Sequence, residues 1–210
     1  MPSIAVVSSP KDASFFAAGV KVVLAKDYLV SSGYPDAREL KVLNFCSSFG
    51  SRSKGYYVSL LAAARGHTPI PSIKTVLETN SPALIQHISH ELDGEIRKAP
   101  FPANSRKFSL HIYFGAASAP PFAELGVGIF RLFPAPFLRA DFRLKKDGWR
   151  LCNLDILSPG KIPSGHSDLA AASLRKNLSG PRRLLRRKAL SCFDRAILFN
   201  EKEEVPPPDP

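Results

Sequence analysis

The chain of 210 residues carries a formal net charge of +11 and is 44% hydrophobic, which is enough for one globular core. No apolar run approaches the ~20 residues that cross a bilayer, and the N-terminus lacks the basic and apolar regions of a signal peptide. The three cysteines, Cys46, Cys152 and Cys192, form no C-x-x-C pair. We therefore expect a cytoplasmic protein with no membrane partner and no disulfide framework.

The first part of the chain predicts strands around one helix. Residues 3–9 are a short apolar segment, residues 19–29 alternate as a strand does, and residues 41–46 are an apolar run of strand length. Pro69 and Pro71 make residues 68–71 an extended segment.

The helix predicted over residues 55–65 completes this unit. Ser53 is its expected N-cap, and Gly66 is the expected left-handed residue that ends it. Its expected buried face consists of Tyr57, Leu60, Leu61 and Ala64. A strand, a crossover helix and a second strand make a βαβ-like unit.

The rest of the chain predicts helices and consecutive strands. Ser81 and Pro82 begin a helix, and Asp147 with Gly148 is a hairpin turn. Strands are expected at 108–115, 127–133, 137–144 and 149–157, and helices at 167–178 and 182–192. The predicted fold class is α+β, a βαβ-like N-terminal unit followed by a mostly antiparallel sheet with flanking helices.

The loop of residues 47–53 leads from a strand end into a helix start, where backbone N–H groups and the helix dipole favour an anion. It resembles a P-loop, but Tyr56 and Tyr57 stand where Lys and Ser/Thr are required, so a Walker-type nucleotide site is rejected. The loop is either an ordinary polar connection or an anion-holding element. The candidate anion-binding residues are Ser48, Ser51, Arg52, Ser53 and Lys54.

Two further pairs of residues are candidates, one for a metal site and one for a catalytic pair. His87 and His90 lie three apart on a predicted helix, but their spacing matches neither zincin pattern and no further ligands follow, so no metal site is predicted. Cys46 with His67 would be the nucleophile and base of a self-contained enzyme, although a buried structural cysteine is the simpler interpretation. No catalytic residue is assigned.

Several blocks resemble the RimK-like ATP-grasp N-terminal domain. The segments are 42–46 (VLNFC), 53–62 (SKGYYVSLLA) and 64–67 (ARGH), supported by 27–29 (DYL) and 133–136 (FPAP). Ser47 and Ala63 depart from the family pattern, which usually has Arg and Glu there. The resemblance implies a domain over residues 1–199, followed by an acidic, Pro-rich linker or tail at 200–210.

The resemblance also implies a function. The chain would be a non-catalytic accessory domain of an ATP-grasp ligase that joins a carboxylate to an amine, and would contribute to acceptor binding or docking. Its partner would be an ATP-grasp catalytic domain, in cis or in trans, that brings ATP and Mg²⁺. No cofactor is expected in this chain itself, and without that domain it would not hydrolyse ATP.

The alternative function is a basic module for RNA or another anionic ligand. Seven basic residues and no acid lie between Asp168 and Asp194, and they include Arg175 and Lys176. Phosphate neutralisation by such a cluster gives salt-dependent binding. The candidate polyanion-binding residues are Arg182, Arg183, Arg186, Arg187 and Lys188.

Overall fold

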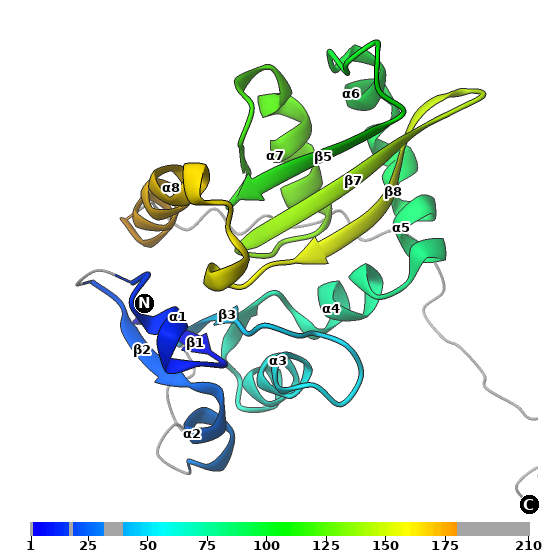
Figure 1. Ribbon diagram of the computed structural model, residues 1–210. Helices are drawn as coiled ribbons and strands as arrows, with labels where there is room; N and C mark the ends of the chain where they lie inside the picture. Colours follow the sequence, from blue (N-terminus) through cyan, green and yellow to red (C-terminus); the bar gives the residue numbers. More distant parts are fainter. Residues whose placement is uncertain (1, 17–18, 32–39, 180–210) are drawn as a thin grey trace, which may run out of the picture.

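The computed structural model describes residues 2–16, 19–31 and 40–179. These residues form a parallel four-stranded sheet with helices, followed by an antiparallel four-stranded sheet with helices. Figure 1 shows the antiparallel sheet above the parallel one, with α4 (Ile73–Thr79) and α5 (Pro82–Ser89) leading from the parallel sheet to the antiparallel one. The predicted α+β class is confirmed.

The parallel sheet has the strand order β2-β1-β3-β4. Its strands are β1 (Ser3–Val7), β2 (Lys21–Leu24), β3 (Lys41–Phe45) and β4 (Thr68–Ile70). The associated helices are α1 (Pro10–Ala13), α2 (Ala25–Val30), α3 (Lys54–Ala64) and α4 (Ile73–Thr79). The chain runs from β1 to β2 on one side and then to β3 on the other, so the strand order reverses between β1 and β3. In open α/β sheets ligands bind outside the carboxyl ends of the strands at such a point.

The ends of α3 agree with the prediction, but its buried face does not. Ser53 accepts a hydrogen bond from the Tyr56 N–H as N-cap, and Gly66 follows the helix with a φ of +73°. The buried residues are Gly55, Val58, Ser59 and Ala62, whereas Tyr57 and Leu60 are 43% and 41% exposed. The helix is apolar on nearly every side, so its small residues, which allow the closest approach, face the sheet.

The strand predicted over residues 19–29 is too long. β2 ends at Leu24, and α2 follows at once. Ala25 and Tyr28 are the buried residues of α2, and this three-residue spacing belongs to a helix face rather than to strand alternation.

The antiparallel sheet has the order β6-β5-β7-β8. Its strands are β5 (Lys107–Tyr113), β6 (Ala116–Ala117), β7 (Phe137–Lys145) and β8 (Gly148–Ile156). The helices are α5 (Pro82–Ser89), α6 (Asp93–Lys98), α7 (Ala123–Leu132) and α8 (Ser167–Ser179). Short 3-10 turns are η1 (His90–Leu92), η2 (Pro120–Phe122), η3 (Pro159–Lys161) and η4 (Ser164–His166). The predicted hairpin joins β7 to β8, and Gly148 supplies its positive φ of +115°.

The strand predicted over residues 127–133 is wrong, because this segment belongs to α7. Gly126 and Gly128 make the sequence look unlike a helix, since glycine is a weak helix former. Both sit at close contacts, where a Cβ would lie 2.9 Å from the Ala117 Cβ and 2.8 Å from the Leu92 Cδ2, respectively. Tertiary packing at these two glycines therefore overrides helix propensity.

An aromatic cluster joins the two sheets. Phe45 at the end of β3 packs against Phe137 at the start of β7, with ring centroids 4.9 Å apart. Tyr113, Leu157 and Leu174 of α8 are buried in the same cluster. This cluster therefore contains residues of both sheets, and the end of β3 is held against the antiparallel sheet.

Candidate functional site

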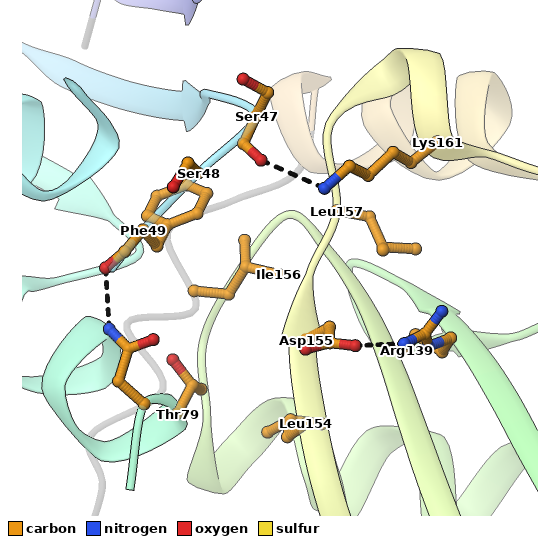
Figure 2. Close-up of a pocket in the computed structure, with 11 residues that line it drawn as sticks. Ser47, Ser48, Phe49, Thr79, Arg139, Leu154, Asp155, Ile156, Leu157 and Lys161 are labelled. Atoms are coloured by element: carbon orange, nitrogen blue, oxygen red, sulfur yellow. Dashed lines mark hydrogen bonds and ion pairs between the residues drawn. The ribbon is translucent and has the colours of Figure 1, made fainter. Parts of the chain in front are cut away.

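A cavity of about 380 Å³ lies between the two sheets, within the size range of ligand pockets. One wall is the loop of residues 47–49 with Thr79 and Asn80 at the end of α4. The other wall is residues 154–157 of β8 and its extension, with Arg139 of β7 and Lys161 of η3. Figure 2 shows the loop and the strand facing each other across the cavity.

The position of the cavity follows from the topology of the parallel sheet. The loop of residues 47–49 leaves the carboxyl end of β3, next to the end of β1. The Ser47 N–H donates to the Ser8 hydroxyl at 3.2 Å, which ties the two strand ends together. The cavity therefore lies at the reversal of strand order, where the fold favours a ligand.

Polar groups surround an apolar floor. The Lys161 ammonium donates to the Ser47 carbonyl at 3.2 Å, and the Asn80 amide donates to the Phe49 carbonyl at 2.7 Å. Leu154, Ile156, Leu157 and Phe49 supply the buried apolar surface. The arrangement suits a ligand that has both an apolar part and a charged end.

Arg139 and Asp155 form an ion pair at one side of the cavity. The Nε of Arg139 is buried without a hydrogen bond and lies 3.5 Å from Asp141 Oδ1. Asp141 also accepts from the Ser109 hydroxyl at 2.7 Å. These residues hold the guanidinium against the sheet, because carboxylates contact it from two sides.

A histidine and tyrosine cluster lies next to Arg139. Tyr113 Oη and His166 Nδ1 share a hydrogen bond at 2.9 Å, and the His111 and His166 rings are 5.1 Å apart. Burial lowers the pKa of His111, and the nearby His166 and Arg139 lower it further, against a smaller opposite effect of Asp141. Burial raises the pKa of Tyr113 to about 12. Both side chains are therefore neutral at pH 7.

Of the five candidate anion-binding residues, Ser48 lines the cavity. The other four, Ser51, Arg52, Ser53 and Lys54, do not line it. Much of the loop's hydrogen-bonding capacity is used internally, because the Ser48 carbonyl accepts from the Ser53 hydroxyl at 2.9 Å and from the Gly55 N–H at 3.2 Å. Arg52 and Lys54 are exposed. Anion binding by this loop stays a prediction.

The structure separates Cys46 from His67. Cys46 follows the carboxyl end of β3, whereas His67 precedes Thr68, the partner of Lys41 at the opposite end. About five residues of strand lie between them, which is roughly 16 Å. Burial also raises the pKa of the Cys46 thiol to about 11. His67 instead shares a buried hydrogen bond of 2.8 Å with Tyr28. These two residues do not form a catalytic pair.

The two histidines of the predicted helix lie on the surface. His87 and His90 are both exposed. In the described ranges, no group of three or more His, Cys, Asp or Glu residues could hold a metal ion. Within those same ranges no helix is long and apolar enough to cross a membrane.

The five candidate polyanion-binding residues, from Arg182 to Lys188, lie outside the described residues. So do the predicted helix at 182–192 and the tail at 200–210. Arg175 and Lys176, which begin the basic cluster, are exposed near the end of α8. Polyanion binding stays a prediction.

Sequence reasoning missed Asn80, Arg139, Asp155 and Lys161. The alternation of residues 149–157 predicts that Asn153 and Asp155 share one face of a strand, which was an available signal. The pairing of Asp155 with Arg139 depends on the register of β7 and β8, which contains a bulge. The approach of Lys161 to Ser47 spans 114 residues of sequence, so no local pattern predicts it.

The chain matches the family model described as RimK-like ATPgrasp N-terminal domain over residues 25–173. None of the curated proteins matches it. Among solved structures, 23 chains match. The macrocyclase MdnB from Microcystis aeruginosa MRC is 9% identical, with 84% of this chain and 98% of that chain covered and a TM-score of 0.48. The ATP-grasp ligase PsnB complexed with minimal precursor is 10% identical, with 84% and 99% covered and a TM-score of 0.45.

Proposed function

The chain belongs to the RimK-like ATP-grasp N-terminal domain family, and from this premise we propose that it is the non-catalytic accessory domain of an ATP-grasp ligase. Such a ligase joins a carboxylate to an amine. The catalytic domain, in the same chain or on a partner, brings ATP and Mg²⁺. The domain described here contributes one wall of the site for the acceptor, the substrate that carries the amine.

The observation that supports this role is the cavity between the parallel and antiparallel sheets. It lies at the carboxyl end of β3, and its floor is apolar while Lys161 and Asn80 lie at its rim. Lys161 forms its hydrogen bond with a backbone carbonyl, so its ammonium keeps two donors for a ligand. The cavity therefore suits the orientation of a substrate rather than bond-forming chemistry.

The described residues do not fit ATP with Mg²⁺. Magnesium prefers carboxylate oxygens and phosphates, and Asp155, the carboxylate of the cavity, is already held by Arg139. Tyr56 and Tyr57 directly follow Gly55, at the positions where a P-loop needs a phosphate-binding Lys and a hydroxyl. In this proposal the nucleotide binds to the catalytic domain, and no residue of this chain acts on it.

Reconstitution tests the proposal. The chain is combined with the ATP-grasp domain that copurifies with it or is encoded beside it, and ADP release and ligated product are measured together. We expect product only when both parts are present. In this assay, Lys161→Ala should raise the KM for the acceptor about tenfold with kcat nearly unchanged, as expected when ground-state and transition-state binding are lost equally.

The matched control for Lys161→Ala is Lys146→Ala. Lys146 is exposed in the turn between β7 and β8, so its loss changes the net charge equally without touching the cavity. A ligase that works at full rate without this chain would refute the accessory role. Equal KM values for the two variants would refute the role of the cavity.

A further inference from the structure

Three basic residues lie side by side across the antiparallel sheet, at the end that carries the β7–β8 hairpin. Lys107 of β5 is directly opposite Arg143 of β7, and Arg143 is directly opposite Arg150 of β8. Directly opposite residues project from the same face of a sheet, and neighbouring strands are ~4.8 Å apart, so the three backbone positions span only about 10 Å. We call these three residues the basic row.

The charge of the basic row is only partly balanced. Lys107 and Arg143 are exposed, and in the described ranges neither takes part in an ion pair. Asp141 lies on the same face of β7, but it contacts Arg139 and Ser109. Like charges directly opposite each other destabilise a sheet. The fold therefore keeps a cluster of positive charge whose repulsion an anionic partner would relieve.

A hollow of about 200 Å³ opens beside the basic row, between α6 and the β7–β8 hairpin. Figure 1 shows these two elements at the same end of the antiparallel sheet. Arg150 belongs to both features, because it lines the hollow while its guanidinium donates to Asp93 and to Asp147, each at 2.7 Å. Among the described residues, none lines both this hollow and the cavity beside residues 47–49.

Two aromatic rings line the hollow. Phe101 and Trp149 stack with ring centroids 4.6 Å apart and an angle of 15° between the ring planes, and both residues are partly exposed. Ile96 and Ala99 add apolar surface, and Arg97 adds an exposed cation. The volume lies below the roughly 300–1,000 Å³ of pockets for drug-sized molecules, so the hollow suits a single planar ring. Aromatic side chains beside a basic surface are the groups on which bases stack in proteins that bind single strands.

We propose that this end of the antiparallel sheet binds a single-stranded nucleic acid, with one base in the hollow beside Trp149 and the neighbouring phosphates on Lys107 and Arg143. Phosphates bring the negative charge that the basic row lacks, and a base brings the planar apolar surface that the hollow accepts. Arg150 stands between the two, where the strand passes from phosphate contact to base contact. This surface goes beyond the proposed role in ligation and does not depend on it.

Quenching of tryptophan fluorescence tests the proposal, because Trp149 is the only tryptophan in the chain. The probes are octathymidylate and octauridylate, added to the full chain at 50 mM salt, with binding followed in parallel by the anisotropy of labelled oligomers. Both should quench the fluorescence as they bind, because a base contacts the indole ring and stacking tolerates either sugar. Absence of binding, or binding without quenching, would overturn the inference.

Matched polyanions separate base contact from charge alone. An abasic octanucleotide carries the same phosphates without bases, so it should bind at least about fivefold more weakly and leave the fluorescence unchanged. Octaglutamate, an acidic peptide of similar charge, should also leave the fluorescence unchanged. If either compound bound as tightly as octathymidylate, the surface would recognise charge only, and a base site in the hollow would be refuted.

The double variant Lys107→Ala with Arg143→Ala tests the basic row. The slope of log affinity against log salt should become shallower by about 1.4, the value for two phosphate contacts on a single strand, while quenching at saturation is kept. The matched control is Lys74→Ala with Arg131→Ala, which removes the same charges from exposed positions on α4 and α7. This control should keep the slope of the parent.

Thermal unfolding separates a binding role from a structural one. The double variant of Lys107 and Arg143 should be at least as stable as the parent at low salt, because two opposed like charges are removed. Reduced stability with an unchanged salt slope would assign both residues to the fold. An equal change of slope in the control variant would reduce the effect to net charge. Either result would refute the basic row as a binding surface.

Discussion

The side-chain amide of Asn44 donates to the Ser59 hydroxyl at 3.0 Å, inside the interface between β3 and α3. The same amide nitrogen donates to the Gly55 carbonyl at 2.8 Å, and Ser59 donates onward to the Pro71 carbonyl at 2.8 Å. The side-chain oxygen of Asn44, Oδ1, accepts from the Cys46 N–H at 3.2 Å. One buried asparagine therefore links the strand, the crossover helix and the segment that follows β4.

Asn44→Ala should lower the free energy of unfolding by about 2–4 kcal/mol, because several buried groups lose a partner at once. Urea unfolding measures the change. Ser59→Ala should cost less, and the double variant should cost less than the sum of the two single variants, since both act in one network. Simple additivity would show that the two side chains are not coupled.

Gly55 is required by the close approach of the loop before α3. A Cβ there would lie 2.4 Å from the Ser48 carbonyl oxygen and 2.9 Å from Phe49 Cδ1. Gly55→Ala should destabilise the protein by about 1–3 kcal/mol, the usual range for overpacking, and should displace the cavity wall at residues 47–49.

Gly50→Ala is the matched control for this prediction. A Cβ at Gly50 has no atom within 4 Å and its φ is not in the left-handed region, so stability should be unchanged or slightly higher. Thermal unfolding of the two variants gives the comparison. Equal stability of the two variants would mean that the loop rearranges around the added methyl group at Gly55 without a loss of folding free energy.

The sequence predicts the ends of the helices and strands better than it predicts which of their faces are buried. The N-cap at Ser53, the hairpin at Gly148 and the strand of 41–46 depend on local chemistry, so local patterns find them. The buried face of α3 depends on which side of an apolar helix meets the sheet. The helix at 123–132 contains two glycines that allow Ala117 and Leu92 to pack closely against it. No pattern within either segment carries that information.

The candidate site shows the same division. The loop after β3 is predicted as a site from its place between strand and helix, and Ser48 does line the cavity. The opposite wall comes from β8 and Lys161, more than 100 residues later in the chain. The position of β8 and Lys161 opposite the loop depends on how the antiparallel sheet packs on Phe45, which only the tertiary structure shows.

Cys46 should make the protein less stable at alkaline pH. Burial raises its pKa from 9.0 to about 11. Between these values the unfolded chain loses the thiol proton more readily than the folded chain does. The contribution of Cys46 to the free energy of unfolding is therefore full below about pH 9 and is lost as the pH rises toward 11. The loss amounts to about 2–3 kcal/mol at most.

Cys46→Ala should remove this part of the pH dependence, so the stability difference from the parent should change between pH 9 and 11 and be flat below. Urea unfolding over that range measures it. Tyr113, whose pKa is about 12, adds a separate loss at higher pH in both proteins. Reaction of Cys46 with iodoacetamide at pH 7 should be slow; rapid labelling would contradict burial as the cause.

The basic cluster that begins at Arg175 predicts salt-dependent binding of RNA. If the cluster neutralises phosphates, affinity should fall steeply between 50 and 200 mM salt. Filter binding across a salt series measures the slope, and replacement of Arg182, Arg183 and Arg186 by Ala should make it shallower by about one unit per contact. A flat profile would rule out this function.

The loop after β3 predicts weak anion binding through Arg52 and Lys54. Both side chains are exposed, and Lys54 is the first residue of α3, where the helix dipole favours negative charge. The combined change Arg52→Ala and Lys54→Ala should lower affinity for inorganic phosphate severalfold, because the helix dipole that remains contributes only about 0.3–1 kcal/mol.

The thermal stability of this double variant should stay nearly the same, because the internal hydrogen bonds of the loop belong to Ser48, Ser53 and Gly55. Isothermal titration and thermal unfolding give the two numbers. Loss of stability with unchanged phosphate affinity would show that the two basic residues are structural.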